Sequence, residues 1–296
     1  APRILNLSTS VNQVVGLSNG KIAMLSGAFG VDIPVVNVIN TDGSPVYSTD
    51  LGSTFSARSS NKMAVKLYPI ANGELIVTVE GTGAGCANGT DNPFQFLRLN
   101  ASGSIVTPLT DINTITGTFN CNTDMAELSN GNLAFTYQSE GTSHSLRIMQ
   151  PNGTAVTGPI SLNDVCTNSS EPIARIAANG TGSFIVTHDC VIDATLYGAL
   201  YDDDGSEILV GGNQQFVIGT HTVYPNVHVM GLTDNNFMVA YNSGSGFVFK
   251  KVTPTGMITS AGTYSSPGGE PIFEALGDGG FVAFDSRVVP GGGFNN

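Results

Sequence analysis

Apolar residues along the chain form short runs that predict β-strands. The runs are five to eight residues long, rich in Val, Ile, Phe and Tyr, and separated by Asn-Gly or Asp-Gly pairs. No stretch keeps a helical period over three turns, whereas short runs bounded by turn residues are typical of strands. The chain is therefore expected to be all-β.

One sequence pattern recurs, an apolar strand followed by a tight turn and a second apolar strand. It reads Leu-Ser-Asn-Gly-Lys-Ile-Ala-Met at 17–24, and close copies stand at 70–77 and 128–135. Looser copies follow, and steps of about 50 residues are typical of repeat architectures. The six predicted turn markers are Gly20, Gly73, Gly131, Gly180, Asn235 and Gly279.

A second turn follows each of the first five markers, at 42–43, 102–103, 152–153, 204–205 and 255–256. Each repeat is thus predicted to contain two hairpins, with strands A, B, C and D. Asn-Gly and Asp-Gly indicate two-residue turns, because these residues reach positive φ at little cost. Strand B has the most regular apolar pattern, as at 184–186, 237–239 and 281–283, and should be buried on both faces.

These repeats resemble the divergent β-propeller repeats of secreted and cell-surface proteins. The resemblance covers nearly the whole chain and implies an all-β single propeller of about six four-stranded blades, in which strand A is innermost. The chain has no Trp, so the Trp-Asp pairs of WD40 repeats are absent, as is the Asp-x-Asp-x-Asp-Gly of integrin-like calcium blades. Two β-sandwich domains are the alternative, which the regular step argues against.

One domain is expected over residues 1–296, with approximate blades at 10–60, 61–121, 122–169, 170–223, 224–268 and 269–296. Only 17 residues follow Gly279, too few for a complete C and D hairpin. Residues 1–9 are therefore predicted to complete the last blade, since an open sheet edge exposes backbone donors and acceptors. The same strand could instead join the last blade of a neighbouring molecule.

Charge is sparse and acidic. Charged residues make up 11% of the chain, and the net charge is −12. This balance repels phosphate backbones and anionic lipid headgroups, so nucleic acid is a poor partner. No apolar run approaches the roughly 18 residues of a spanning helix, so membrane insertion is not expected.

The cysteines and the glycosylation sequons point to a secreted protein at an extracellular surface. The four cysteines lack CxxC spacing, which favours disulfides, and the predicted pairs are Cys86 with Cys121 and Cys166 with Cys190. Four buried thiols are the alternative. Six Asn-x-Ser/Thr sequons permit glycosylation, although chance in this composition would give nearly as many. They are Asn6, Asn88, Asn100, Asn152, Asn168 and Asn179.

The sequence signals for catalytic and metal-binding residues are weak. The run Asp202-Asp203-Asp204-Gly205 reads as an exposed type I′ turn rather than a calcium loop. Two histidines, His188 and His228, fall on strands, as structural rather than zinc-binding residues. His188-Asp189-Cys190 reads as a disulfide site rather than a nucleophilic thiol. A glycosidase pair is conceivable among carboxylates near the links between hairpins, namely Asp111, Asp124, Asp164, Glu171 and Asp189.

The sequence therefore predicts a non-enzymatic extracellular structural module, a subunit of a surface fibre, sheath or matrix. Its expected partners are copies of itself or other extracellular proteins, and no cofactor, metal or catalytic residue is predicted. A carbohydrate-binding, lectin-like propeller is the alternative, disfavoured because sugar pockets often use Trp and this chain has none. A propeller glycoside hydrolase is the third reading.

Overall fold

The computed structural model describes most of the strands that the repeat predicts. The residues described are 11–27, 33–55, 63–81, 94–113, 123–138, 144–162, 174–190, 193–221, 226–244, 246–265, 272–276 and 280–284. The chain divides into two compact units. The first is Ala1–Glu127 with Gly131–Ser161, and the second is Leu128–Asn130 with Leu162–Asn296. The single domain over 1–296 stays a prediction.

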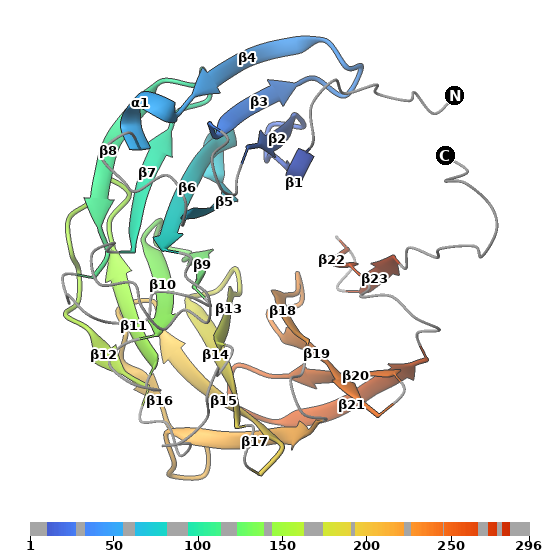
Figure 1. Cartoon of the computed structure of the whole chain (residues 1–296). Coiled ribbons are helices and arrows are strands. Elements are labelled where there is room, and N and C mark those ends of the chain that lie inside the picture. The colour runs from blue at the N-terminus through green and yellow to red at the C-terminus, as the bar shows by residue number, and fades with distance from the viewer. Residues whose placement is uncertain are drawn as a thin grey trace. The chain divides into compact units, whose positions relative to one another are not determined.

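Three four-stranded antiparallel sheets precede residue 162 (Figure 1). Sheet 1 holds β1 (Val11–Gly16), β2 (Ile22–Ser26), β3 (Val35–Ile39) and β4 (Pro45–Asp50). Sheet 2 holds β5 (Met63–Ile70), β6 (Glu74–Gly81), β7 (Gln95–Leu99) and β8 (Ile105–Asp111). Sheet 3 holds β9 (Asp124–Glu127), β10 (Leu133–Gln138), β11 (His144–Met149) and β12 (Ile160–Ser161).

Three further antiparallel sheets belong to the second unit. Sheet 4 holds β13 (Ala174–Ala178), β14 (Ser183–Cys190), β15 (Thr195–Asp202), β16 (Glu207–Ile208) and β17 (Gln215–Thr220), the last two both pairing with β15. Sheet 5 holds β18 (Val227–Gly231), β19 (Phe237–Ser243), β20 (Gly246–Val252) and β21 (Ile258–Tyr264). Sheet 6 holds β22 (Ile272–Ala275) and β23 (Phe281–Phe284).

Helical structure within the described residues is confined to two short segments, α1 (Gly52–Phe55) and the 3₁₀ turn η1 (Ala71–Gly73). Neither approaches the length that a membrane crossing requires, and no helix among the described residues qualifies. The all-β prediction is confirmed, and the six sheets fall within the six predicted blade ranges. The predicted strand at residues 1–9, and the closure built on it, lie outside the described residues.

Strand B is buried on both faces in the first five sheets, as its apolar pattern predicts. Every residue of β14 is buried, as are Phe237 to Tyr241 of β19. On β6, Leu75 and Val77 pack with residues of sheet 1, whereas Ile76 packs with residues of sheet 3. The alternation follows from the period of two along a strand. In sheet 6 the prediction is wrong, because residues 281–283 of β23 are only half-buried in a sheet that has two described strands.

Most hairpin loops differ from the predicted two-residue turns. In the first loop, the Gly20 N–H donates to Leu17 O (2.9 Å) and the Leu17 N–H to Lys21 O (2.8 Å), which encloses three residues. Only the third loop residue, Gly20, has a positive φ, of 79°. This is a three-residue loop ending in a left-handed residue rather than a type I′ turn. The same pair of hydrogen bonds closes the loops that begin at Asn40, Asn100, Gln150, Asp202, Leu232 and Thr253.

Two loops qualify that pattern. Asn72 and Gly73 both have positive φ (62° and 72°) between Ala71 O and the Glu74 N–H, so this predicted turn does have the type I′ form. In sheet 4 the left-handed residue is Gly182, with φ of 96°, and not the predicted marker Gly180. The reason is that the loop begins at Asn179, whose N–H donates to Ser183 O, so its third position is 182.

Candidate functional site

The predicted disulfide and glycosylation residues are only partly within the described chain. Cys190 is buried and disulfide-bonded, but Cys86, Cys121 and Cys166 lie outside the described residues. The pairings therefore stay predictions. Asn6, Asn88 and Asn168 also lie outside.

The three described sequons differ in how accessible their amide nitrogens are. Asn152 is exposed and Asn100 is half-buried, each in a loop between strands C and D. Asn179 is 3% exposed, and its Nδ2 donates to Ser183 Oγ (2.8 Å) and Asn235 O (3.0 Å). Both of its amide hydrogens are thus used. In the folded chain Asn179 is a structural residue and not an accessible glycosylation site.

The three aspartates before Gly205 have separate structural surroundings. Asp204 Oδ1 accepts the Ser206 N–H (2.8 Å) and caps its own loop, and this hydrogen bond holds the pKa of the carboxyl below its ordinary value. Asp202 is exposed, whereas Asp203 is 9% exposed and bonded to another loop. The predicted exposed type I′ turn is wrong in both respects, because only Gly205 has a positive φ (89°) and Asp203 is buried.

The histidines sit among packed side chains. His188 on β14 is buried with its ring stacked on Tyr197 (centroids 5.6 Å apart), and His228 on β18 packs edge-on to Phe273 (4.9 Å). His144 and His221 are also buried. Among the described residues, no group of three or more His, Cys, Asp and Glu is placed to hold a metal ion.

The carboxylates considered for a glycosidase each have separate structural surroundings. Asp111 accepts a hydrogen bond from Gln95, and Asp124 Oδ1 accepts from Tyr68 Oη (3.3 Å). Asp189 is 1% exposed on β14. Asp164 and Glu171 lie outside the described residues.

Polar side chains of the first unit instead connect neighbouring sheets. The Gln13 side chain on β1 donates to Leu67 O (2.9 Å) and accepts the Leu67 N–H (2.8 Å) on β5. Its amide thus forms hydrogen bonds with both the N–H and the carbonyl of Leu67, as a neighbouring strand would. Sequence reasoning missed this contact, because 54 residues separate the two partners.

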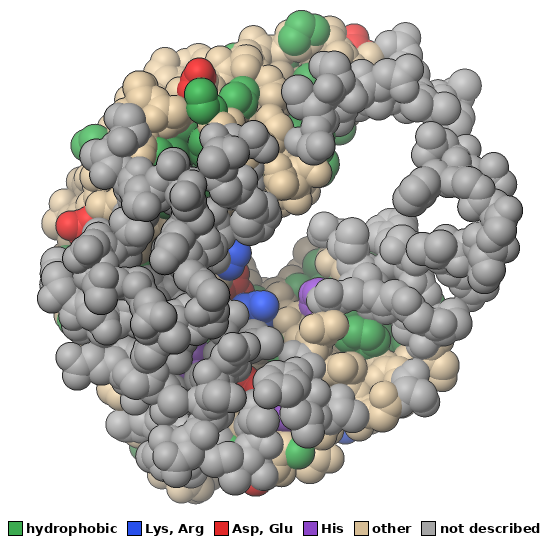
Figure 2. Space-filling view, viewed as in Figure 1, with side chains coloured by type: hydrophobic (Ala, Val, Ile, Leu, Met, Phe, Trp, Pro, Cys, Tyr) green, Lys and Arg blue, Asp and Glu red, His purple; other side chains and the backbone are tan. Residues whose placement is uncertain are grey.

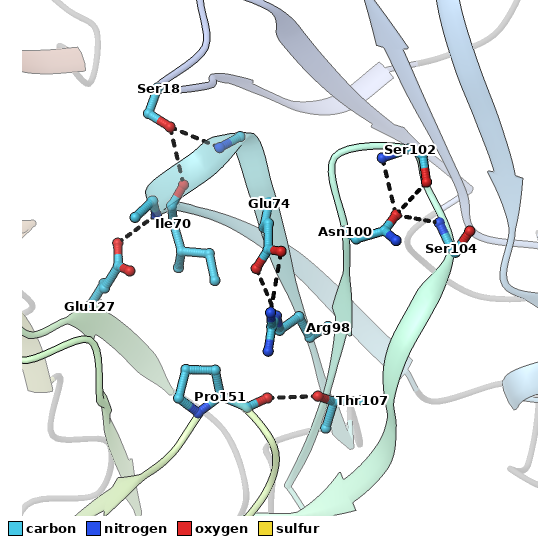
Figure 3. Close-up of polar contacts among 12 residues, drawn as sticks. Ser18, Ile70, Glu74, Arg98, Asn100, Ser102, Ser104, Thr107, Glu127 and Pro151 are labelled. Atoms are coloured by element: carbon cyan, nitrogen blue, oxygen red, sulfur yellow. Dashed lines mark hydrogen bonds and ion pairs between the residues drawn. The ribbon is translucent and has the colours of Figure 1, made fainter.

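Two loops of the first unit are joined in the same way (Figure 3). Ser18 Oγ accepts the Gly73 N–H (2.9 Å) and lies 3.4 Å from Ile70 O. Glu127, at the end of β9, accepts the Ala71 N–H through Oε2 (2.8 Å). The turn at 71–73 is therefore held from both neighbouring sheets. Burial raises the pKa of Glu127, opposed by the Ala71 hydrogen bond, with repulsion from Glu74 adding to the rise.

A pH prediction follows from Glu127. A carboxyl whose folded pKa is raised is most favourable to folding when protonated, and this contribution is lost as pH rises through the folded pKa. The side chain of Glu127→Gln stays neutral. The melting temperature of this variant, relative to that of the parent, should therefore be higher at about pH 7 than at about pH 4. Thermal melts of both proteins at the two pH values measure this. An equal difference at both would show that Glu127 has an ordinary pKa.

Outer strands are joined to the next sheet by threonines. Thr49 Oγ1 on β4 donates to Gly103 O (2.8 Å), in the loop between β7 and β8. Thr107 on β8 donates to Pro151 O (2.7 Å), in the corresponding loop of sheet 3 (Figure 3). These loops approach so closely that a Cβ on Gly103 would lie 2.4 Å from Tyr47 Cδ2. In sheets 1 and 2, strand D is thus covered by the next loop between strands C and D.

Within the second unit, Asp203 makes the densest contact between loops. Its Oδ2 accepts Ser129 Oγ–H (2.5 Å) and the Asn130 N–H (3.1 Å), and its backbone oxygen accepts from Asn130 Nδ2 (3.1 Å). A carboxylate with two donors at one oxygen makes strong, charge-assisted bonds. These partners are 73 and 74 residues away in sequence, so no local pattern could have indicated them.

One group on the inner strands of the first unit has a composition that could bind a polar ligand. Lys66 Nζ donates to Thr123 O (2.9 Å), and Tyr68, two residues along β5, bonds Asp124. All three side chains, Lys66, Tyr68 and Asp124, are half-buried. On the face in Figure 2, few charged side chains of the described residues are visible, among hydrophobic side chains and a larger area of other side chains and backbone.

Comparisons with known proteins bear on the fold. No family model matches the chain, and no curated protein matches it. Among solved structures, a streptogramin B lyase superposes with a TM-score of 0.55 at 13% identity, over 96% of this chain and 86% of that one. The Dos1 propeller gives 0.55 at 10% identity, over 92% and 67%. The chain has a β-propeller fold.

A lectin shares this propeller fold. The Aleuria aurantia lectin, in complex with α-methyl-L-fucoside, superposes with a TM-score of 0.52 at 14% identity, over 86% of this chain and 77% of that one. At such identities the likeness establishes the fold alone. The predicted resemblance to divergent propeller repeats is confirmed at the level of architecture.

Proposed function

We propose that this propeller is a non-enzymatic structural module of an extracellular assembly, acting through association with itself or with other extracellular proteins. The observation that supports the proposal is the use of its polar groups. Gln13, Ser18, Glu127, Asn179 and Asp203 all bond backbone or side chains of other sheets or loops. Polar groups that are hydrogen-bonded in this way stabilise the blades rather than bind a substrate.

The outer strands support the same proposal from the surface side. Apolar side chains exposed by 41% or more lie on or beside them, and such side chains mark an interaction surface where they form one contiguous patch. Those of the outer strands and their loops are Ile105, Val106, Val156, Leu209, Val217 and Met257. The disulfide at Cys190 is consistent with an oxidising compartment.

Sedimentation velocity and negative-stain images of the purified full chain test the proposal. We expect mass to rise with protein concentration, as dimers or longer assemblies form. A chain that stays monomeric alone and captures no extracellular protein from its native surface would refute the structural role.

A carbohydrate-binding role is the second candidate, and it rests on the group of Lys66, Tyr68 and Asp124. A half-buried tyrosine beside a carboxylate and an ammonium offers a stacking face and hydrogen bonds to hydroxyls. A glycan array tests it. Glycan binding that is lost in Tyr68→Ala would favour this role over assembly.

A further inference from the structure

The outer part of sheet 4 carries a polar group whose hydrogen bonds all lie within that sheet and its turn. Tyr197 on β15 is half-buried, and its hydroxyl donates to Oδ2 of Asp193 (3.0 Å). Asp193, in the turn before β15, is exposed, and its Oδ1 accepts the Thr195 N–H (3.0 Å). Among the described residues, no lysine or arginine pairs with Asp193. An exposed carboxylate is thus held in place beside an aromatic ring.

An exposed apolar side chain lies directly beside this ring. Val217 on β17 stands opposite Tyr197 in the ladder and is 53% exposed. Directly opposed residues have their side chains on the same face of the sheet, with Cβ atoms about 5 Å apart. On its other side, the Tyr197 ring is stacked on the buried ring of His188. Tyr197 and Val217 therefore form one apolar surface, with Asp193 at its edge.

A β-bulge in β17 gives Val217 this position. The pairing of β15 with β17 shifts between Leu196 and Tyr197, so Ile218 is an extra residue on β17. Ile218 is 4% exposed and packs in the same core cluster as Leu196, on the face of the sheet opposite to Tyr197. Without the bulge, Ile218 would stand opposite Tyr197 in place of Val217. Bulges are frequent beside functional sites, where they redirect a side chain.

The turn that contains Asp193 has a strained backbone. Ala194 has φ of 53°, and of the described residues it alone is in the left-handed region without being glycine or asparagine. The β-carbon makes this conformation costly for alanine, and residues held in it are concentrated at ligand sites. The Ala194 carbonyl accepts the His221 N–H (2.8 Å), which ties the turn to the end of β17. The turn is thus fixed in a form that places Asp193 beside Tyr197.

The composition of this group selects among classes of ligand. The Asp193 carboxylate and the net charge of −12 disfavour anions. A metal ion is disfavoured because the described residues hold no group of three or more side chains placed to bind one. An uncharged pyranose has hydroxyls that donate to a carboxylate and C–H groups that pack on an aromatic ring. We propose that Asp193, Tyr197 and Val217 form a binding site for a neutral pyranose.

This site goes beyond the proposed structural function and is independent of it. It lies on outer strands of the second unit, whereas the group of Lys66, Tyr68 and Asp124 lies on inner strands of the first unit. Its role would be to attach the module to polysaccharide in its surroundings.

Calorimetric titration of the full chain with simple methyl glycosides tests this site. The probes are the methyl β-glycosides of glucose and galactose and the methyl α-glycoside of mannose. Asp193→Asn, Tyr197→Ala and Val217→Ser alter the three proposed contacts, and Tyr197→Phe keeps the ring in case the alanine variant does not fold. Asp202→Asn and Val106→Ser are matched controls, because both positions are exposed and lie outside the site. Circular dichroism establishes that each variant folds.

We expect at least one glycoside to bind the parent with a Kd on the order of 1 mM, as a small exposed site allows. Asp193→Asn and Tyr197→Ala should each raise this Kd about tenfold, because each removes a principal contact. Val217→Ser and Tyr197→Phe should raise it about threefold, since each removes a smaller one. Both controls should stay within about twofold of the parent.

Three results would overturn the site. The first is that no glycoside binds at about 50 times the expected Kd, or that binding ignores the substitutions at Asp193 and Tyr197. The second is binding that is lost in Tyr68→Ala and kept in Tyr197→Ala, which would assign the sugar to the inner strands. The third is binding of tetramethylammonium, added as a cationic probe, in place of the glycosides. None of these results affects the structural function, which is tested by sedimentation of the parent chain.

Discussion

Replacing Phe135 by alanine should lower the free energy of unfolding by about 4 kcal/mol, because a large aromatic side chain is removed from a filled core. Phe135, on β10, is fully buried. Its ring lies 5.9 Å from that of Phe94, edge to face, and 5.2 Å from that of Phe96. The cavity would open between sheets 2 and 3, whose side chains share one cluster. Urea unfolding followed by circular dichroism measures the loss.

Two further variants separate the cavity from other effects. Phe135→Leu keeps much of the volume and should cost about 1–2 kcal/mol. Val106→Ala, at a position 47% exposed on β8, should change stability by less than about 0.5 kcal/mol. If Phe135→Ala cost no more than Val106→Ala, the packing of sheet 2 on sheet 3 would be incorrect.

The sequence predicts the repeat and its strands well because both depend on local chemistry. Asn-Gly and Asp-Gly pairs mark the loops, and runs such as Phe237 to Tyr241 are long enough to fill both faces of a central strand. The loop type was missed because glycine serves both a two-residue turn and the third position of a longer loop. In sheet 4, two glycines compete, and the start of the loop at Asn179 decides for Gly182.

The contacts between sheets could not be predicted, because they join residues 44 to 74 positions apart. Gln13 and Leu67 give no local sign of one another, nor do Ser129 and Asp203. The three consecutive aspartates show the limit most clearly. Local reading treats them as one acidic turn, whereas the fold buries the middle one and leaves its neighbours exposed.

That middle residue gives the second large expected effect. Replacing Asp203 by alanine should lower the free energy of unfolding by about 2 kcal/mol, because the charge-assisted hydrogen bonds that its 9% exposed side chain accepts are lost. The donors are Ser129 Oγ–H and the Asn130 N–H. Asp203→Asn keeps one side-chain acceptor and should cost about half as much. Urea unfolding of the three proteins at one pH measures both differences.

Asp202→Ala is the matched control, since Asp202 is the preceding residue, bears the same charge and is exposed. It should alter stability by less than about 0.5 kcal/mol, as an exposed surface substitution does. The comparison removes the effect of net charge, which both substitutions change equally. If both variants lost the same stability, the cause would be charge or loop conformation, and Asp203 would not hold the loop at 129–130. A loss confined to Asp203→Ala, and reduced in Asp203→Asn, identifies the carboxylate oxygen as the group that joins the two loops.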